Sequence, residues 1–205
     1  MDDQLDTYLT IAKPTEAILL KERKSKFYGY AFPIDDEEQV KPIIDSLRKK
    51  YPSANHVCYA WQIGVHDPTY RANDDGEPNN SAGMPIYGQI QSFGVTNLVI
   101  AVVRIFGGTK LGVGGLISAY KNTAQLTLEH SDIKEGIIQK SFELQFAYPE
   151  MDIVMRLIKK NQLNIVDQEL KLECKITVSV RASEFEKIMK ECNSFHKLKI
   201  TPKKH

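Results

Sequence analysis

The chain has 205 residues, of which 42% are hydrophobic and 26% are charged, and its formal net charge at pH 7 is +1. These values are typical of globular proteins and exclude both a disordered chain and a strongly basic domain that coats nucleic acid. The length favours two domains, and any anion site must come from a local cluster of charge.

The cysteines and the apolar segments indicate a cytoplasmic protein that binds no membrane. Three cysteines without a CxxC motif, Cys58, Cys174 and Cys192, favour reduced thiols. The acidic opening MDDQLDTYLT lacks the apolar core of a signal peptide. The longest apolar run, at 98–103, is far shorter than the ~20 residues of a membrane helix.

In the first part of the chain, strands and helices are predicted to alternate after a loose polar leader at 1–14. Two strands are expected within 16–34, on either side of the charged bend KERKSK. Further elements are predicted as a helix at 35–50, a strand at 56–64, a loop at 65–80, a helix at 81–92 capped by Ser81, a buried strand at 97–105 and a helix at 116–129. The last helix is expected to bury Leu116, Tyr120, Thr123, Ala124, Thr127 and Leu128.

A polar segment at 131–135 is the predicted boundary between a domain at 1–130 and a domain at 131–205. In the second domain, hydrophobic periodicity predicts strands and helices in the order βαββαβ, at 137–147, 150–161, 164–170, 174–181, 183–192 and 197–201. That order is the ferredoxin-like split unit. The predicted fold class is therefore α+β with two domains.

Residues 107–115, GGTKLGVGG, hold five of the chain's twelve glycines. Because they lie between a predicted strand and a predicted helix, free backbone N–H groups and the positive end of the helix dipole can face an anion. Glycines also permit the positive φ angles of an anion nest. The predicted anion- or RNA-binding residues are Arg104, Gly107, Gly108, Lys110, Gly112, Gly114, Gly115 and Lys121.

The glycine segment matches neither standard nucleotide motif. No Lys-Ser or Lys-Thr pair follows a glycine, as the Walker A loop requires. A dinucleotide fingerprint beginning at Gly112 would place Ile117 at the third glycine position. A purely structural role, in which the glycines allow a sharp turn from strand to helix, is the alternative. We expect Gly114 to need a positive φ, so that valine there would be damaging.

The loop RANDDGEPNNSAG, at 71–83, is the second candidate site. Its carboxylates Asp74, Asp75 and Glu77 can hold a divalent ion or act as acid and base. Aligned on Gly76, however, the calcium-loop template lacks an acid at its first and last positions, so no metal and no cofactor are expected. A solvated turn is the alternative, because Asp-Gly and Glu-Pro are turn dipeptides.

His56 and Cys58 lie two residues apart in a predicted strand and therefore share one face. A nucleophilic Cys–His pair also needs an orienting group and a thiol of low pKa. The sequence indicates neither of these. A core cysteine beside a structural histidine is the favoured interpretation.

Five motifs in order resemble the YigZ/IMPACT family, namely H-x-C-x-A at 56–60, D-D-G-E-P at 74–78, A-G-x-P at 82–85, R-x-F-G-G-x-K-L-G-x-G-G-L at 104–116 and A-Y at 119–120. The resemblance spans residues 16–130, and 131–205 resembles the C-terminal domain of bacterial members. It implies a first domain similar to the second domain of a small-subunit ribosomal protein. It also implies a second domain similar to the ferredoxin-like C-terminal domain of elongation factor G. The chain departs from the family pattern at Asn80-Ser81, at Val103 and Ile105, and at Ser118.

The resemblance links eukaryotic relatives to translational control and implies no reaction for the bacterial branch. We therefore expect a non-enzymatic module that binds RNA or the ribosome and has a translation factor as a further partner. The alternative is an enzyme acting on a phosphorylated small molecule or nucleotide, with Asp74, Asp75 or Glu77 as base or metal ligand opposite the glycine segment. A protein-interaction module is the third hypothesis.

Overall fold

The computed structural model describes residues 6–203, which divide into two compact units. The first unit is Tyr8–Gly136, and the second contains residues 6–7 and 137–203. The segment at 131–135 that we expect to separate the domains contains the start of strand β7 (Ile133–Ile137). The domain limits 1–130 and 131–205 stay predictions.

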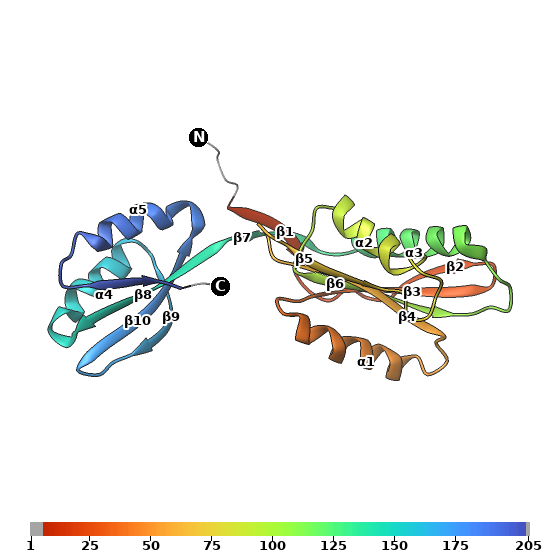
Figure 1. Ribbon diagram of the computed structural model, residues 1–205, viewed down its shortest axis with the longest axis horizontal. Coiled ribbons are helices and arrows are strands. Elements are labelled where there is room, and N and C mark those ends of the chain that lie inside the picture. Colours follow the sequence, from red (N-terminus) through yellow and green to blue (C-terminus); the bar gives the residue numbers. More distant parts are fainter. Residues whose placement is uncertain (1–5, 204–205) are drawn as a thin grey trace. The chain divides into compact units, whose positions relative to one another are not determined.

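A five-stranded antiparallel sheet forms the first unit, with strand order β2-β3-β6-β4-β5 (Figure 1). The strands are β2 (Ile18–Glu22), β3 (Ser25–Pro33), β4 (His56–Ile63), β5 (Thr69–Asn73) and β6 (Leu98–Ile105). The central strand β6 is buried from its first residue to its seventh, which confirms the buried strand predicted at 97–105.

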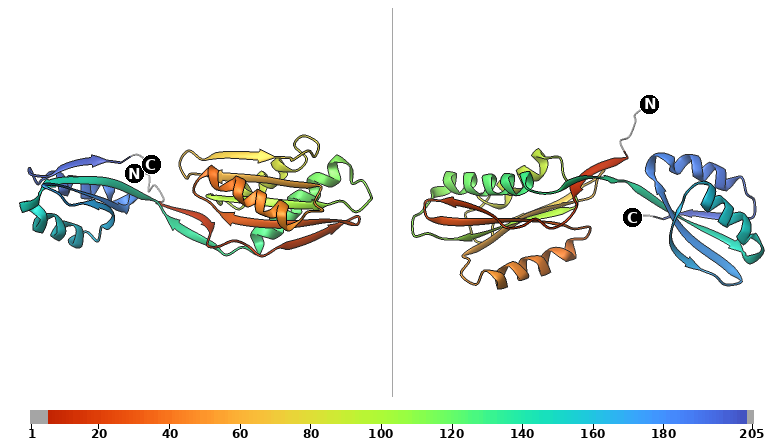
Figure 2. Two further views of the ribbon diagram at one scale, coloured as in Figure 1. Left: turned by 90° about the horizontal axis from the view of Figure 1, so that it is seen from below. Right: turned by 180° about the vertical axis from the view of Figure 1, so that it is seen from behind.

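Helices cover both faces of this sheet (Figure 2). On one face lies α1 (Val40–Lys50), preceded by the short helix η1 (Glu37–Gln39), and on the other lie α2 (Gly83–Ser92) and α3 (Gly112–Glu129). Alternate residues of β6 pack against opposite helical layers. All six residues expected on the buried face of the last helix are buried in α3.

Three local predictions are wrong. The expected leader contains β1 (Thr7–Ile11), which pairs with β7, while residues 1–5 lie outside the described part of the chain. The expected loop at 65–80 contains β5, a polar edge strand that lacks a hydrophobic signal. The last helix begins at Gly112 rather than 116, so the final glycines belong to its first turn.

The second unit confirms the predicted βαββαβ order. Its elements are β8 (Gln139–Ala147), the short helix η2 (Tyr148–Glu150), α4 (Met151–Lys160), β9 (Asn164–Glu169), β10 (Glu173–Arg181), α5 (Ala182–Asn193) and β11 (Lys199–Pro202). The strands form an antiparallel sheet in the order β11-β8-β10-β9, which is the ferredoxin-like arrangement. Side chains of α4 and α5 share one core with alternate residues of β8 and β10.

The chain is therefore an α+β protein of two units, each with its own sheet and core. Among residues 6–203, no helix is both long enough and apolar enough to span a membrane.

Candidate functional site

Asp74 holds the start of α2 in place. Its Oδ1 accepts hydrogen bonds from the backbone N–H groups of Ala82, at 2.9 Å, and Gly83, at 2.8 Å. Its Oδ2 accepts one from the N–H of Asn80, at 2.8 Å. A carboxylate stabilises a helix N-terminus because it satisfies free N–H groups and complements the helix dipole. This contact gives Asp74 a structural role in the acidic loop.

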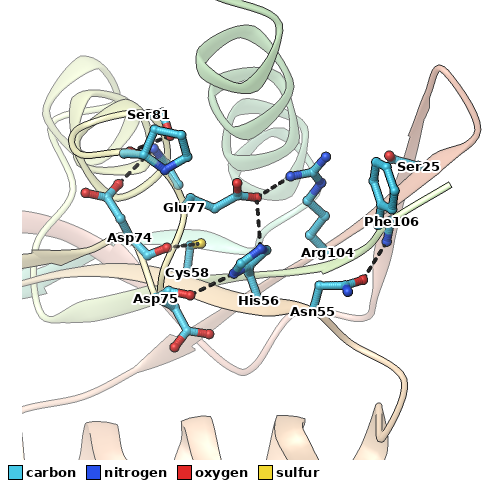
Figure 3. A network of polar contacts seen from close by, with 12 residues as sticks. Ser25, Asn55, His56, Cys58, Asp74, Asp75, Glu77, Ser81, Arg104 and Phe106 are labelled. Atoms are coloured by element: carbon cyan, nitrogen blue, oxygen red, sulfur yellow. Dashed lines mark hydrogen bonds and ion pairs between the residues drawn. The ribbon is translucent and has the colours of Figure 1, made fainter. Parts of the chain in front are cut away.

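The prediction that Ser81 caps this helix is wrong. The Ser81 hydroxyl donates instead to the carbonyl of Pro78, at 2.6 Å (Figure 3). Asp74 supplies the contact from eight residues before Ala82, because the intervening loop folds back on itself. A capping residue that lies this far before its helix in the sequence cannot be recognised from a local sequence motif.

Asp75 ties the acidic loop to the sheet and to α1. Its Oδ1 lies 2.5 Å from Nη2 of Arg48, and its Oδ2 accepts the N–H of Val57 at 2.6 Å. The Asp75 carbonyl lies 2.7 Å from Nδ1 of His56, which must donate because a carbonyl only accepts. Asp75 therefore has partners on α1 and β4, and it orients the imidazole of His56 (Figure 3).

Glu77 is the most buried of the three acids, with 7% of its surface exposed. Its Oε1 accepts hydrogen bonds from Nη1 of Arg104 at 2.5 Å and from the hydroxyl of Tyr120 at 2.8 Å. Nε2 of His56 lies 3.9 Å from the same oxygen (Figure 3). A buried carboxylate is tolerated when a cation and hydrogen bonds compensate for lost water. Glu77 therefore links the acidic loop to β6 and α3.

The thiol of Cys58 has hydrogen-bond partners other than His56. Its Sγ lies 3.0 Å from the carbonyl oxygen of Asp74 and 3.3 Å from the hydroxyl oxygen of Tyr120, and these two acceptors share its single S–H hydrogen. Burial raises the pKa of the Cys58 thiol and of the Tyr120 hydroxyl above their usual values. This geometry is that of a core cysteine.

We expect the thiols to resist modification in the folded protein at neutral pH. All three cysteines are buried, and burial raises the pKa of Cys192 to about 11 as well as raising that of Cys58. Because the thiolate is the reactive form, a soluble thiol reagent should modify Cys58 only after unfolding. Mass spectrometry of digested protein, with urea-treated protein as the control, measures this. Rapid labelling of Cys58 in the native protein would contradict it.

The glycine segment packs against the turn between β2 and β3. The N–H of Gly107 donates to Oγ of Ser25 at 3.2 Å, and the N–H of Phe106 donates to Oδ1 of Asn55 at 2.8 Å (Figure 3). A Cβ at Gly107 would lie 2.0 Å from the carbonyl carbon of Lys24. Only glycine allows two backbones to approach this closely.

Positive φ angles occur at Gly108, +87°, and Gly112, +73°. The expectation that Gly114 needs this conformation is wrong, because Gly114 lies in the first turn of α3, outside the positive-φ glycines. A Cβ at Gly114 would have no atom within 4 Å. A glycine is therefore needed for its positive φ at Gly108 and Gly112, which precede Gly114.

The predicted cations divide into a buried and an exposed group. Arg104 is 6% exposed, is paired with Glu77, and lies over the rings of Phe27 and Phe106 at 5.5 and 5.6 Å. Lys110 and Lys121 are exposed, and within residues 6–203 neither takes part in an ion pair. Arg104 thus supports the loop from inside, and the assignment of these residues to an anion site stays a prediction.

Sequence reasoning missed a second basic segment beside the glycines. Arg23 and Lys24 form the β2–β3 turn with φ angles of +42° and +68°, and both are exposed. Two-residue hairpin turns usually carry Asn or Gly here, because other residues adopt positive φ at a cost of roughly 1 kcal/mol. The contact of Gly107 with Lys24 joins this turn to the glycine segment. We call residues 21–26 and 106–111 together the basic tip.

The charged bend was visible in the sequence, but its position beside the glycines was not. About 80 residues separate Lys24 from Gly107, and no local pattern reports a contact over that separation. The four cations of the turn region, at 21, 23, 24 and 26, are all exposed.

Comparisons with known proteins place this chain in a family. Residues 23–128, more than half of the chain, match the Impact N-terminal domain. IMPACT family member YvyE of Bacillus subtilis is 30% identical over 158 residues, which cover 77% of this chain and 72% of that protein. The chain belongs to the IMPACT family. IMPACT family member YigZ of Escherichia coli is 28% identical over 182 residues, covering 88% of this chain and 89% of that protein.

The fold of this IMPACT family chain is also similar to that of a solved structure. A crystal structure of a hypothetical protein matches 98% of this chain and is itself covered to 99%, with a TM-score of 0.76 and 25% sequence identity. The family match and the named relatives confirm the resemblance read from the five motifs. The matched family domain includes the acidic loop and nearly the whole basic tip.

Proposed function

We propose that the first unit binds RNA through the basic tip and acts in translation. The observation that supports this most directly is the close packing of Gly107 on Lys24, which joins the exposed cationic β2–β3 turn to the segment that carries Lys110. Arg23, Lys24 and Lys110 carry unpaired positive charge among the described residues. Such cations bind phosphates with release of counterions.

Two further features of the tip suit a single strand of RNA. Phe106 is 41% exposed, and an exposed aromatic ring can stack on a base of any identity. The N-cap residue of α3, Leu111, makes no side-chain capping bond, so the first N–H groups of the helix are available to phosphate oxygens. We therefore expect binding without strong sequence preference.

The buried network explains how the tip keeps its shape. Glu77 holds Arg104 at the end of β6, and Asn55 and Ser25 accept the N–H groups of Phe106 and Gly107. A surface ordered before binding loses less conformational entropy when its ligand arrives. The resemblance to eukaryotic relatives linked to translational control supports RNA on the ribosome as the ligand, with a translation factor as a partner.

The enzyme alternative has less support. Asp74, Asp75 and Glu77 each already accept hydrogen bonds from the protein, which reduces their capacity to serve as base or metal ligand. Within the described residues, no group of three His, Cys, Asp or Glu side chains could hold a metal ion.

Lys110→Ala is expected to weaken RNA binding similarly for different sequences. Removal of one phosphate contact should make the slope of log affinity against log salt shallower by about 0.7 for a single strand. Lys24→Ala should have the same effect. Fluorescence anisotropy with labelled single-stranded RNAs, in a salt series starting near ~50 mM, measures both quantities.

Lys49→Ala is the matched control. Lys49 is an exposed lysine on α1, and α1 covers the face of the sheet opposite to the face covered by α2 and α3. This variant should keep the parent slope. If the parent protein binds no RNA at low salt, or if Lys110→Ala and Lys24→Ala behave like Lys49→Ala, the proposal is wrong.

A further inference from the structure

The second unit has a partly apolar groove between α4 and the end of α5. The groove has a volume of about 570 Å³ and is lined by Ile153, Leu157 and Phe195 among its apolar residues. The core takes Val154, Leu157 and Ile158 from α4. Ile153 lies outside that core cluster and is half-buried, and Phe195 is 36% exposed.

The opposite flank of α4 is also hollowed. A shallower groove of about 910 Å³ lies there, and it contains Met155, which is 41% exposed, with Ile158 and Leu163. Apolar side chains therefore line grooves on both flanks of α4, and an apolar groove with a polar rim is a common feature of protein interaction sites. Met also adapts readily to different partner surfaces.

Positive charge surrounds the groove between the helices. Arg156, Lys159 and Lys160 occupy positions i, i+3 and i+4 of α4, so they lie on one helical face. Glu191 is the acid of this groove, and Lys160 binds it at 2.7 Å and lowers its pKa. Within residues 6–203, Arg156 and Lys159 take part in no ion pair. The groove therefore presents apolar surface with a net positive rim.

We propose that this groove receives an amphipathic helix of a partner protein that carries acidic side chains beside its apolar face. Ile153, Leu157 and Phe195 match the apolar face of such a helix, and Arg156 and Lys159 match its acids. RNA fits less well, because Phe195 is the one aromatic ring that lines the groove and the other apolar lining residues, Ile153 and Leu157, cannot stack on bases. The inference is independent of RNA binding, since it concerns the other unit.

A designed peptide helix with leucines on one face and glutamates elsewhere is the probe. We expect its titration into the isotope-labelled full-length protein to shift backbone amide NMR signals of α4 and of the end of α5. A scrambled peptide of the same composition should bind at least tenfold more weakly, because it lacks an apolar face. Charge reversal in the double variant Arg156→Glu/Lys159→Glu should lower the affinity for the amphipathic peptide by a similar factor.

Lys199→Glu is the matched control, because Lys199 is an exposed lysine of β11 in the same unit and lies outside this groove. This variant should bind the amphipathic peptide as the parent does. The proposal is overturned if millimolar peptide shifts no signal of α4 and α5, or if Lys199→Glu weakens binding as much as the double variant. It is also overturned if a single-stranded RNA displaces the peptide and shifts these signals at lower concentration.

Discussion

Gly107→Ala is expected to lower the free energy of unfolding of the first unit by roughly 2–3 kcal/mol, the upper part of the range for an overpacked site. The added Cβ would lie 2.0 Å from the carbonyl carbon and 2.1 Å from the carbonyl oxygen of Lys24. Both are backbone atoms, so relief of the clash requires the β2–β3 turn to move as a whole. The same movement would separate the two halves of the basic tip and weaken RNA binding.

Gly114→Ala is the control within the same segment. A Cβ there would meet no atom within 4 Å, and the residue is helical. Alanine is the better helix former, so the variant should be more stable than the parent by about 0.5–1 kcal/mol. The two substitutions should therefore act in opposite directions, although each adds one methyl group to the glycine segment.

Urea unfolding followed by tryptophan fluorescence measures both variants. The single tryptophan, Trp61, is buried in the first unit, so its fluorescence reports on the unfolding of that unit. Equal midpoints for Gly107→Ala and Gly114→Ala would contradict the close contact between Gly107 and the β2–β3 turn.

The hydrophobic pattern of the sequence predicted the helices that bury one face and the strand that is buried on both faces. The run of β6 is apolar because helices cover both faces of its sheet, and the stripes of α3, α4 and α5 follow from one buried face each. β5 gave no signal because an exposed edge strand needs no apolar side chains. β1 was missed because its stability comes from pairing with β7, about 120 residues later.

Only those features of the candidate site that depend on neighbouring residues in the sequence were predicted. The glycine segment pointed to the correct strand-to-helix connection. Arg104 follows Ile100 and Val102 at intervals of two along β6, so its inward orientation was readable from strand alternation. The pairing of Arg104 with Glu77 could not be predicted from the sequence, because an ion pair between a loop and a strand produces no regular spacing of residues.

Glu77→Ala is expected to lower the free energy of unfolding of the first unit by about 3–5 kcal/mol, the usual effect of removing one partner from a buried ion pair. Arg104 would keep a charge with 6% of its surface exposed, and the buried hydroxyl of Tyr120 would lose its acceptor. Neither group can turn to water without opening the core between the sheet and α3.

Glu37→Ala removes an exposed carboxylate of the same unit and should change stability by less than about 0.5 kcal/mol. The double variant Glu77→Leu/Arg104→Met should be more stable than Glu77→Leu alone, because it leaves no buried charge unpaired. The fluorescence of Trp61 during urea unfolding follows all four proteins. If Glu77→Ala is as stable as Glu37→Ala, or if Glu77→Leu/Arg104→Met is no more stable than Glu77→Leu, the buried charge of Arg104 does not depend on Glu77. In that case the acidic loop does not hold the basic tip in place, and its structural role is limited to the start of α2.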